Sequence, residues 1–130
     1  AAKQSGESAM GMAGVQHSDI DLAMIYDSFT ITVLATLENL GFCEAGAGGD
    51  FVSNGGIGLG GALPVNPDGG GLSSNHPGMR GIFLVIEATK QLRSECGERQ
   101  VQGAEVAIAH GTGGTIGDKH SGATLVLGVD

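Results

Sequence analysis

A short apolar run that passes almost directly into a helix pattern is the feature that most limits how this chain can fold. In DIDLAMIYDSFTITVLATLENLGF (residues 19–42), Leu22–Ile25 are typical of a short buried strand. From Phe29 onward, apolar residues recur at helical spacing as far as Leu40, and Gly41 favours a helix end there. A strand followed at once by a helix is typical of an α/β layer. Residues 26–28 should then lie at the carboxyl end of a strand, where open α/β sheets bind ligands.

A second amphipathic helix is predicted over RGIFLVIEATKQLRSECG (residues 80–97). Pro77 suits the first turn of such a helix, and Gly97 is expected to end it. The expected apolar face contains Ile82, residues 84–86, Thr89 and Leu92, and the expected polar face contains Glu87, Lys90, Arg93 and Glu95.

The rest of the chain supplies further extended segments and one more helix. Residues 3–14 suit a helix, and residues 62–65, 105–109 and 124–127 suit strands or extended segments. The order strand, helix, loop, strand, helix, strand, strand predicts an α/β layer with a mixed sheet that ends in an antiparallel pair.

The chain contains 25 glycines, which gather in residues 46–71 and 111–117. They follow no fixed period, so collagen-like and solenoid folds are excluded. Glycine lets a ligand approach the backbone closely, and this distribution therefore predicts a site lined by backbone. Gly69, Gly70 and Gly71 do not form a P-loop, because no Lys-Ser or Lys-Thr follows them.

Size and charge exclude several classes of protein. With 130 residues and 41% hydrophobic composition, the chain suits one compact domain, and a net charge of −8 disfavours nucleic acid as a partner. No apolar run reaches the length of a membrane span, and no secretory signal opens the chain, so we expect a soluble, cytoplasmic protein. Cys43 and Cys96 lack metal-site spacing and are expected to be reduced thiols.

Three polar loops, at residues 26–28, 66–76 and 110–114, are expected at the carboxyl ends of strands. If they converge, they form a pocket with a histidine and several backbone donors. His76 precedes the expected start of the second helix, where the helix dipole favours a neutral imidazole that can accept a proton or activate a thiol. An ordinary surface histidine at a helix start is the alternative.

Three other polar residues of these loops each have a structural alternative. Asn66 can hydrogen-bond a substrate carbonyl or simply open an Asn-Pro turn. Asp27 is expected mainly to cap the helix that follows it. Tyr26 can donate a hydrogen bond to an enolate or alkoxide oxygen, or it can pack at a half-buried strand end.

Structural roles are preferred for the remaining histidines. His110 can be catalytic, but packing beneath the glycine loop is the preferred interpretation. His17 and His120 lie outside the three loops and are expected at the surface. No third ligand accompanies His76 and His110, so no metal site is expected.

Four blocks in order resemble the C-terminal domain of the thiolase superfamily, most of all its sterol-carrier-protein-type branch. They are YDSFTITVLATLENLGFC, LPVNPDGGGLSSNHPGMRG, QLRSECGERQVQGAEVAIAHGTGG and ATLVLG. The resemblance spans residues 14–128 and implies half of a thiolase-like fold: a mixed five-stranded sheet with antiparallel last strands and helices on both faces. It also implies that residues 1–130 are a fragment of a two-domain chain, partnered by an N-terminal thiolase domain and forming a homodimer.

The resemblance implies roles for several residues. His76 matches the thiolase histidine that deprotonates the nucleophilic cysteine and helps bind the thioester oxygen. Gly69, Gly70 and Gly71 belong to the stretch that lies along the acyl-CoA site, and Gly113 in the late glycine loop is likewise expected to bind substrate. A coenzyme A thioester is therefore the expected substrate, and no permanently bound cofactor is expected.

The departures from the family pattern concern the acid cysteine. The sterol-carrier type carries His-Asp-Cys-Phe where this chain has residues 26–29, so Ser28 replaces the cysteine. Other thiolases carry a cysteine in the late glycine loop, where this chain has His110, Gly111 and Thr112. A hydroxyl is a much weaker acid than a thiol, so ordinary thiolysis is in doubt, and Ser28 and His110 remain possible catalytic residues.

A tyrosine at the head of the block resembles the thiolase-like retro-aldolases, which cleave steroid side chains as coenzyme A thioesters. Tyr26 fits that pattern, whereas His76 departs from it, because those lyases carry a tyrosine in the loop. The first prediction is an acyl-CoA C-acyltransferase of the acetyl-CoA acetyltransferase type, with His76 as base and Tyr26 and Asn66 as donors. The alternatives are a retro-aldol lyase on 3-hydroxyacyl-CoA and, for the isolated chain, a non-catalytic assembly module.

Overall fold

The computed structural model describes residues 1–74, 78–116 and 119–129. Their helices and strands are α1 (Ala2–Ala13), η1 (His17–Asp19), β1 (Leu22–Ile25), α2 (Thr30–Leu40), α3 (Gly48–Val52), η2 (Ser53–Gly55), α4 (Arg80–Leu92), η3 (Gly97–Arg99), β2 (Val106–Ile116) and β3 (Lys119–Gly128). The α/β class, the strand Leu22–Ile25 and the helix that ends at Leu40 are confirmed. Gly41 ends that helix in the left-handed conformation, with φ 87°.

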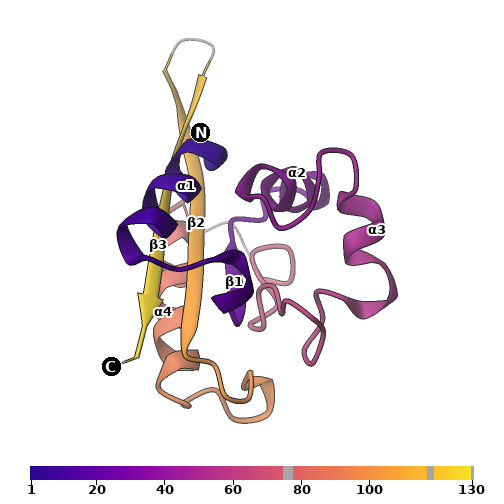
Figure 1. The fold of residues 1–130 in the computed structure, drawn as a ribbon, viewed down its shortest axis with the longest axis vertical. Helices are drawn as coiled ribbons and strands as arrows, with labels where there is room; N and C mark the ends of the chain where they lie inside the picture. Colours follow the sequence, from indigo (N-terminus) through magenta and orange to yellow (C-terminus); the bar gives the residue numbers. More distant parts are fainter. Residues whose placement is uncertain (75–77, 117–118, 130) are drawn as a thin grey trace.

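The sheet has the order β1-β2-β3, with β1 parallel to β2 and β2 antiparallel to β3 (Figure 1). The mixed sheet with an antiparallel end pair is thus confirmed. The expected five strands are not: the described residues form three.

The segment expected as a strand at residues 62–65 makes only one bridge, Ala23 to Val65, in parallel. Pro64 has no N–H to donate, and Asn66 has a φ of 47°, which turns the chain away from β1. The Asn66 side-chain amide then pairs with both the N–H and the C=O of Ile25, at 2.8 Å each. A side chain therefore continues the pairing that a fourth strand would have made.

The glycine loop expected at residues 110–114 is instead part of β2. The pairing with β3 continues through Gly111 opposite Ala123 and Thr112 opposite Gly122, and it shifts between Gly113 and Thr115. The loop prediction was wrong because backbone pairing to β3 compensates for the low strand propensity of glycine.

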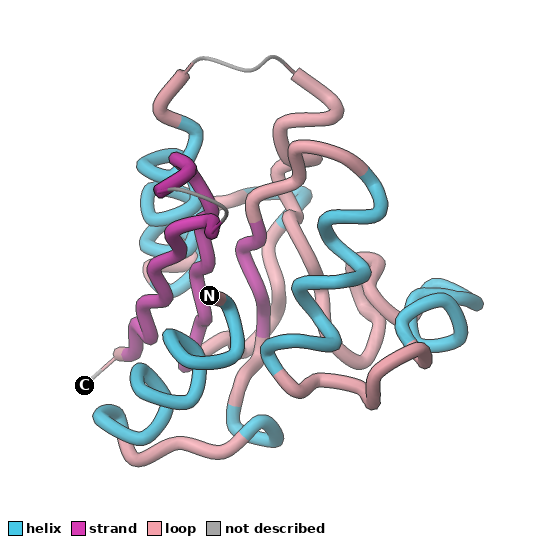
Figure 2. Tube along the Cα trace, turned by 90° about the horizontal axis from the view of Figure 1, so that it is seen from above, coloured by secondary structure: helices cyan, strands magenta, loops and turns pink. Residues whose placement is uncertain are grey.

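Two helical layers cover opposite faces of the sheet, as Figure 2 shows for α1 and α4. Along β1, Ala23 and Ile25 pack in the core on the side of α1 and α2, whereas Leu22 and Met24 pack in the core on the side of α4. This alternation is the period of two expected for a strand buried on both faces. Helices on both faces are therefore confirmed.

α4 departs from the prediction in length and in orientation. It ends at Leu92 rather than near Gly97, and its buried residues are Arg80, Leu84, Glu87, Ala88 and Gln91. Ile82 and Ile86 of the expected apolar face are 53% and 46% exposed. The polar residues can be buried because each finds a hydrogen-bonding partner, which the apolar pattern alone could not indicate. Within the described residues, no helix is both long and apolar enough to span a membrane.

Candidate functional site

The three predicted polar segments converge at the carboxyl end of β1, beside the start of α4. A cavity of ≈ 400 Å³ lies between Tyr26, Ser28, residues 78–81 and the glycines of β2. A second cavity of ≈ 490 Å³ lies between residues 26–29, Gly71, Leu72 and Arg80. Tyr26, Ser28 and Arg80 contribute to both cavities, so these form one candidate site with two lobes.

Tyr26 and Ser28 are placed by the end of β1. The Tyr26 N–H donates to the carbonyl of His110 at 2.9 Å, which extends the parallel pairing by one residue. The Ser28 hydroxyl lies 3.0 Å from the Thr32 hydroxyl in the first turn of α2. Both residues are partly exposed, and both line the site, as their position at a strand end predicted.

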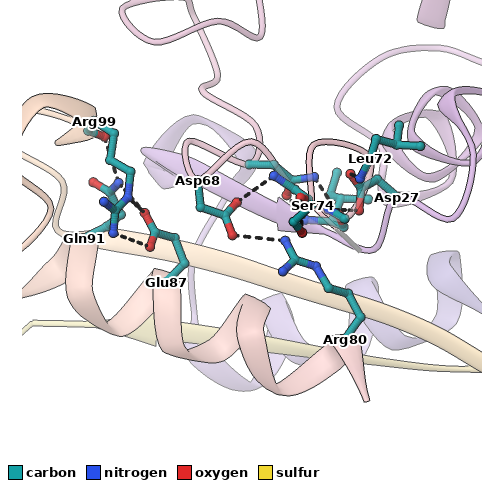
Figure 3. A network of polar contacts seen from close by, with 12 residues as sticks. Asp27, Asp68, Leu72, Ser74, Arg80, Glu87, Gln91 and Arg99 are labelled. Carbon is teal, nitrogen blue, oxygen red and sulfur yellow. Dashed lines mark hydrogen bonds and ion pairs between the residues drawn. The ribbon is translucent and has the colours of Figure 1, made fainter. Parts of the chain in front are cut away.

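Asp27 holds the glycine turn rather than capping the helix that follows it. Its carboxylate accepts the N–H of Gly71 at 2.8 Å and the N–H of Leu72 at 3.1 Å (Figure 3). A Cβ at Gly70 would collide with this carboxylate, so the close approach requires glycine there. The capping expectation was wrong because α2 begins at Thr30, after an N-cap at Phe29 that makes no side-chain hydrogen bond.

The predicted substrate glycines divide into two groups. Gly71 and Gly113 line the second and first cavities, respectively. Gly69 and Gly70 lie outside the residues lining either cavity, and both have positive φ, 88° and 68°. Their conformations shape the turn, and their role in binding substrate stays a prediction.

Asn66 lies at the base of this turn. Its amide oxygen and nitrogen are used by the backbone of Ile25, and its own N–H donates to the Ala23 carbonyl at 3.0 Å. The geometry supports the structural alternative for Asn66. Among the described residues, the Asn66 amide nitrogen donates only to the Ile25 carbonyl, and the role of Asn66 as a polarising donor remains a prediction.

His76 lies outside the described residues, within the gap at 75–77. On the near side of this gap, Leu72 lines the second cavity, and on the far side Gly78 lines the first. The expected role of His76 as base stays a prediction.

His110 is 1% exposed and lies on β2, outside the residues that line the two cavities. Its Nδ1 is 2.8 Å from the hydroxyl of Thr124, which in turn lies 2.7 Å from the hydroxyl of Ser5. Burial lowers the pKa of His110, so its imidazole is held neutral. These contacts support packing, and a catalytic role for His110 is a prediction that they do not favour.

Two residues of the site had no predicted role. His120, expected at the surface, is exposed but lines the first cavity from β3. Arg80, at the first position of α4, is 7% exposed and lines both lobes. A lone arginine before an apolar helix pattern was the available signal, but its burial depends on Asp68, twelve positions away.

The cysteines lie away from the cavities. Cys96 is buried, and burial together with the Glu87 carboxylate raises the pKa of its thiol. Burial and Glu38 likewise raise the pKa of Cys43. Raised pKa values leave less thiolate, so neither thiol has the character of a nucleophile. No three His, Cys, Asp or Glu side chains group together as a metal site in the part of the chain that the structure describes.

The fold and the candidate site define the class of domain: a mixed α/β layer with a candidate site at the carboxyl end of its first strand. The chain belongs to the thiolase C-terminal domain-like family, whose model matches residues 1–128. The resemblance to the thiolase superfamily is therefore confirmed.

Known relatives carry out more than one kind of reaction. The chain is 42% identical to an acetyl-CoA acetyltransferase of Methanothermobacter thermautotrophicus over 87% of its length and 30% of that protein. It is 38% identical to a steroid side-chain-cleaving aldolase of Thermomonospora curvata over 96% of its length and 30% of that protein. The chain thus spans about a third of the length of these two relatives.

A solved structure shows the same fold. An Ltp2-ChsH2(DUF35) aldolase superposes with a TM-score of 0.84 and 32% sequence identity, covering 99% of this chain and 32% of the other. Acyltransferase and aldolase therefore share this domain, and the fold alone does not choose between them.

Proposed function

We propose that the parent protein is an acyl-CoA C-acyltransferase that makes or breaks a carbon–carbon bond in an acyl-CoA thioester. This chain supplies one wall of its active site. The observation that carries the proposal is that Tyr26 and Ser28 line one candidate site in a thiolase-family domain, together with Leu72 and Gly78 from either side of the gap at 75–77. In this assignment His76 is the base, Tyr26 and Asn66 polarise the reacting carbonyls, and the glycines at 71 and 113 leave room for the thioester.

The test is the substitution His76→Ala in the full-length protein. Loss of a catalytic base lowers a rate by roughly 10²- to 10⁴-fold. The rate of cleavage of a 3-oxoacyl-CoA should fall by at least about 10²-fold. His17→Ala is the matched control, because His17 lies away from both cavities and bonds the Leu40 carbonyl at 2.8 Å. Equal rates in wild type and His76→Ala would contradict the assignment of His76 as the base.

A second candidate is retro-aldol cleavage of a 3-hydroxyacyl-CoA. Tyr26 lines both lobes, Ser28 stands where an acid cysteine was expected, and one relative is a steroid side-chain-cleaving aldolase. In this reaction Tyr26, in its phenolate form, takes the proton of the 3-hydroxyl, and the bond between Cα and Cβ breaks to give a ketone or aldehyde. The electron pair left on the thioester fragment is then protonated at Cα.

The two reactions are separated by their products. The full-length protein is incubated with a 3-hydroxyacyl-CoA, and release of a ketone or aldehyde is measured. In a parallel reaction it receives a 3-oxoacyl-CoA and free coenzyme A. A carbonyl product only in the first reaction selects the lyase, and shortened acyl-CoA only in the second selects the acyltransferase.

The outer side of α4 fits the proposed partner domain. Met79, Ile82, Phe83 and Ile86 are 41–76% exposed, and Leu125 of β3 is 50% exposed nearby, at a hollow shared with Gly81. Apolar side chains gathered on one side of a helix are typical of a surface that another domain covers. Because relatives are about three times longer than this chain, the N-terminal thiolase half is the proposed occupant.

The partner proposal also explains how the isolated chain could be a non-catalytic module. Expressed alone, the chain should show no turnover and should associate with other copies of itself through the exposed side of α4. Ile86→Asp should abolish that association, whereas the matched change Ile31→Asp on α2, 66% exposed, should leave it intact. Sedimentation equilibrium of both variants provides the measurement, and equal association of the two would refute this surface.

A further inference from the structure

Arg80 is a buried cation at the wall of the candidate site. It is 7% exposed, and it is the one Lys or Arg that is buried among the described residues. It lines both lobes, together with Tyr26 and Ser28. The chain has only six Lys and Arg residues and a net charge of −8. Burying a charge is unfavourable unless it is paired, so the groups that the Arg80 guanidinium contacts indicate the role of this residue.

Among the described residues, the buried Nε–H of Arg80 is left without an acceptor. Its Nη2 donates to the Asp68 carboxylate at 3.0 Å, and its guanidinium lies 5.5 Å from the centre of the Phe83 ring. Its Nε has no acceptor among the described residues and is shielded from solvent. Leaving a buried N–H unpaired is unfavourable, so this donor calls for an acceptor that the described chain does not contain.

The carboxylates around Arg80 already have partners. Asp68 also accepts the N–H of Gly70 at 3.0 Å, and Asp27 accepts those of Gly71 and Leu72. The Arg80–Asp68 pair is neutral as a whole, and Figure 3 shows it beside Asp27. Because both carboxylates are already held by other donors, the Arg80 Nε is the group of this cluster that is left to meet a carbonyl oxygen.

The start of α4 adds a second source of positive potential. Its N-cap, Met79, makes no side-chain hydrogen bond, and its first turn contains no acidic residue. The positive end of the helix dipole is therefore uncompensated by the residues of the helix itself. Gly81 lines the first cavity, with open space where a side chain would be, so the backbone there can be approached closely.

We propose that Arg80 contacts the substrate and donates an N–H to the thioester carbonyl oxygen as it becomes an enolate oxygen. The inference rests on the proposed function but holds for both candidate reactions. In condensation a proton leaves Cα, and in retro-aldol cleavage the electrons of the Cα–Cβ bond move to Cα. Negative charge reaches the same oxygen in each case, and a fixed donor stabilises it most in the transition state.

The experiment measures the enolate directly. Full-length wild type and Arg80→Met are titrated with acetoacetyl-CoA, whose enolate and keto forms differ in ultraviolet absorbance. The fraction bound as enolate should fall about tenfold or more in Arg80→Met. Because removal of one oxyanion donor lowers kcat by roughly 10²- to 10³-fold, kcat should fall to that extent, with little change in KM. Arg93→Met, at the exposed C-terminal end of the same helix, should match wild type in both measurements.

A second variant separates ligand contact from folding. Arg80→Lys keeps the charge that faces Asp68 but lacks the Nε–H, so its enolate fraction should also fall, even if Arg80→Met fails to fold. An unchanged enolate fraction and kcat in a folded Arg80 variant would overturn this inference and leave the proposed function standing. If wild type itself neither shifts the spectrum nor turns over acyl-CoA, the proposed function fails, and this inference fails with it.

Discussion

Two polar clusters lie along α4 (Figure 3). We call a cluster closed when each of its buried polar side-chain atoms has a hydrogen-bonding partner among the described residues, and open when one of these atoms has none. In the cluster centred on Glu87, the carboxylate accepts two bonds from Arg99 and one from Gln91, and Gln91 is bonded further by residues 99 and 101. In the cluster of Asp27, Asp68 and Arg80, the buried Arg80 Nε has no acceptor in the part of the chain that the structure describes.

The closed cluster lies away from the two cavities, and the open one forms part of their wall. Both clusters combine carboxylate, guanidinium and backbone groups, so composition does not distinguish them. A complete set of hydrogen-bonding partners is typical of a structural network, whereas an unpaired donor beside a cavity indicates a ligand site.

The largest expected effect on stability comes from breaking the closed cluster. Glu87→Ala leaves the buried Gln91 amide and the Arg99 guanidinium without their acceptor, which should lower the free energy of unfolding by about 3 kcal/mol. Urea unfolding of the full-length protein measures this. Glu98→Ala, at an exposed glutamate, is the control and should change stability by less than about 0.5 kcal/mol. The folded Glu87→Ala fraction should retain wild-type kcat, and a loss of kcat would contradict the division between the clusters.

Asp27→Asn tests the open cluster. An amide offers one oxygen where the carboxylate offers two, so either Gly71 or Leu72 loses its acceptor and the glycine turn loosens. We expect a loss of about 1–2 kcal/mol in stability and a fall in kcat of about tenfold or more, because the turn leads into the segment containing His76.

Asp21 provides a matched comparison for Asp27. It too accepts two backbone N–H groups, from Glu105 and Val106 at 2.8 Å each, but it lies outside the site. Both bonds end on one oxygen of Asp21, which the side-chain oxygen of asparagine can replace, so Asp21→Asn should cost less stability than Asp27→Asn and leave kcat unchanged. Equal kcat values in the two variants would show that the turn does not position the site.

The pH dependence of stability tests whether Glu87 stabilises the closed cluster as a carboxylate. Burial by itself would raise the pKa of Glu87, but hydrogen bonds from Arg99 and Gln91 outweigh it, and the pKa lies below its ordinary value. The stabilisation is therefore present above the unfolded-state pKa and is lost as the pH falls through the lower folded-state pKa.

This prediction is tested by comparison with Glu87→Gln, which cannot titrate. The difference in unfolding free energy between wild type and variant should stay constant from about pH 7 to 5 and shrink below that. Each unit by which the pKa is lowered corresponds to about 1.4 kcal/mol. A difference that is still undiminished at about pH 3 would mean that Glu87 does not gain its stability as a carboxylate.

Local patterns in the sequence predicted the parts of the fold that depend on neighbouring residues. The strand Leu22–Ile25 and the helix ending at Gly41 follow from apolar spacing and a glycine stop, and both are confirmed. The buried face of α4 could not be predicted this way, because burial of Glu87 and Gln91 depends on partners at residues 99–101. The length of β2 was missed for the same reason, since its glycines are held by pairing with β3.

The candidate site could be predicted in position but not in detail. Residues at the carboxyl end of a strand face the ligand edge of the sheet, so Tyr26 and Ser28 were found from order alone. Arg80 was missed because its role comes from Asp68 and from the meeting of two loops. Asp27 was assigned to the wrong partner, because its bonds to Gly71 and Leu72 join residues 44 and 45 positions apart.

The smallest expected effect on stability comes from adding a methyl group at Gly81, beside the first cavity. Gly81 lies in the first turn of α4 and lines the first cavity, and a Cβ added there meets nothing within 4 Å. Gly81→Ala should therefore stabilise the protein by up to about 1 kcal/mol through helix propensity. Gly11→Ala in α1, where a Cβ also meets nothing within 4 Å, should stabilise it to a similar extent.

The two glycine variants should differ in substrate affinity. If the thioester lies against the start of α4, the new methyl group at residue 81 occupies ligand space and raises the KM for acyl-CoA about two- to tenfold, whereas Gly11→Ala leaves KM unchanged. Steady-state kinetics of both variants at one temperature provides the measurement. If Gly81→Ala gains stability and keeps the wild-type KM, the ligand does not use the first cavity, and the site must be assigned to the lobe beside Gly71 instead.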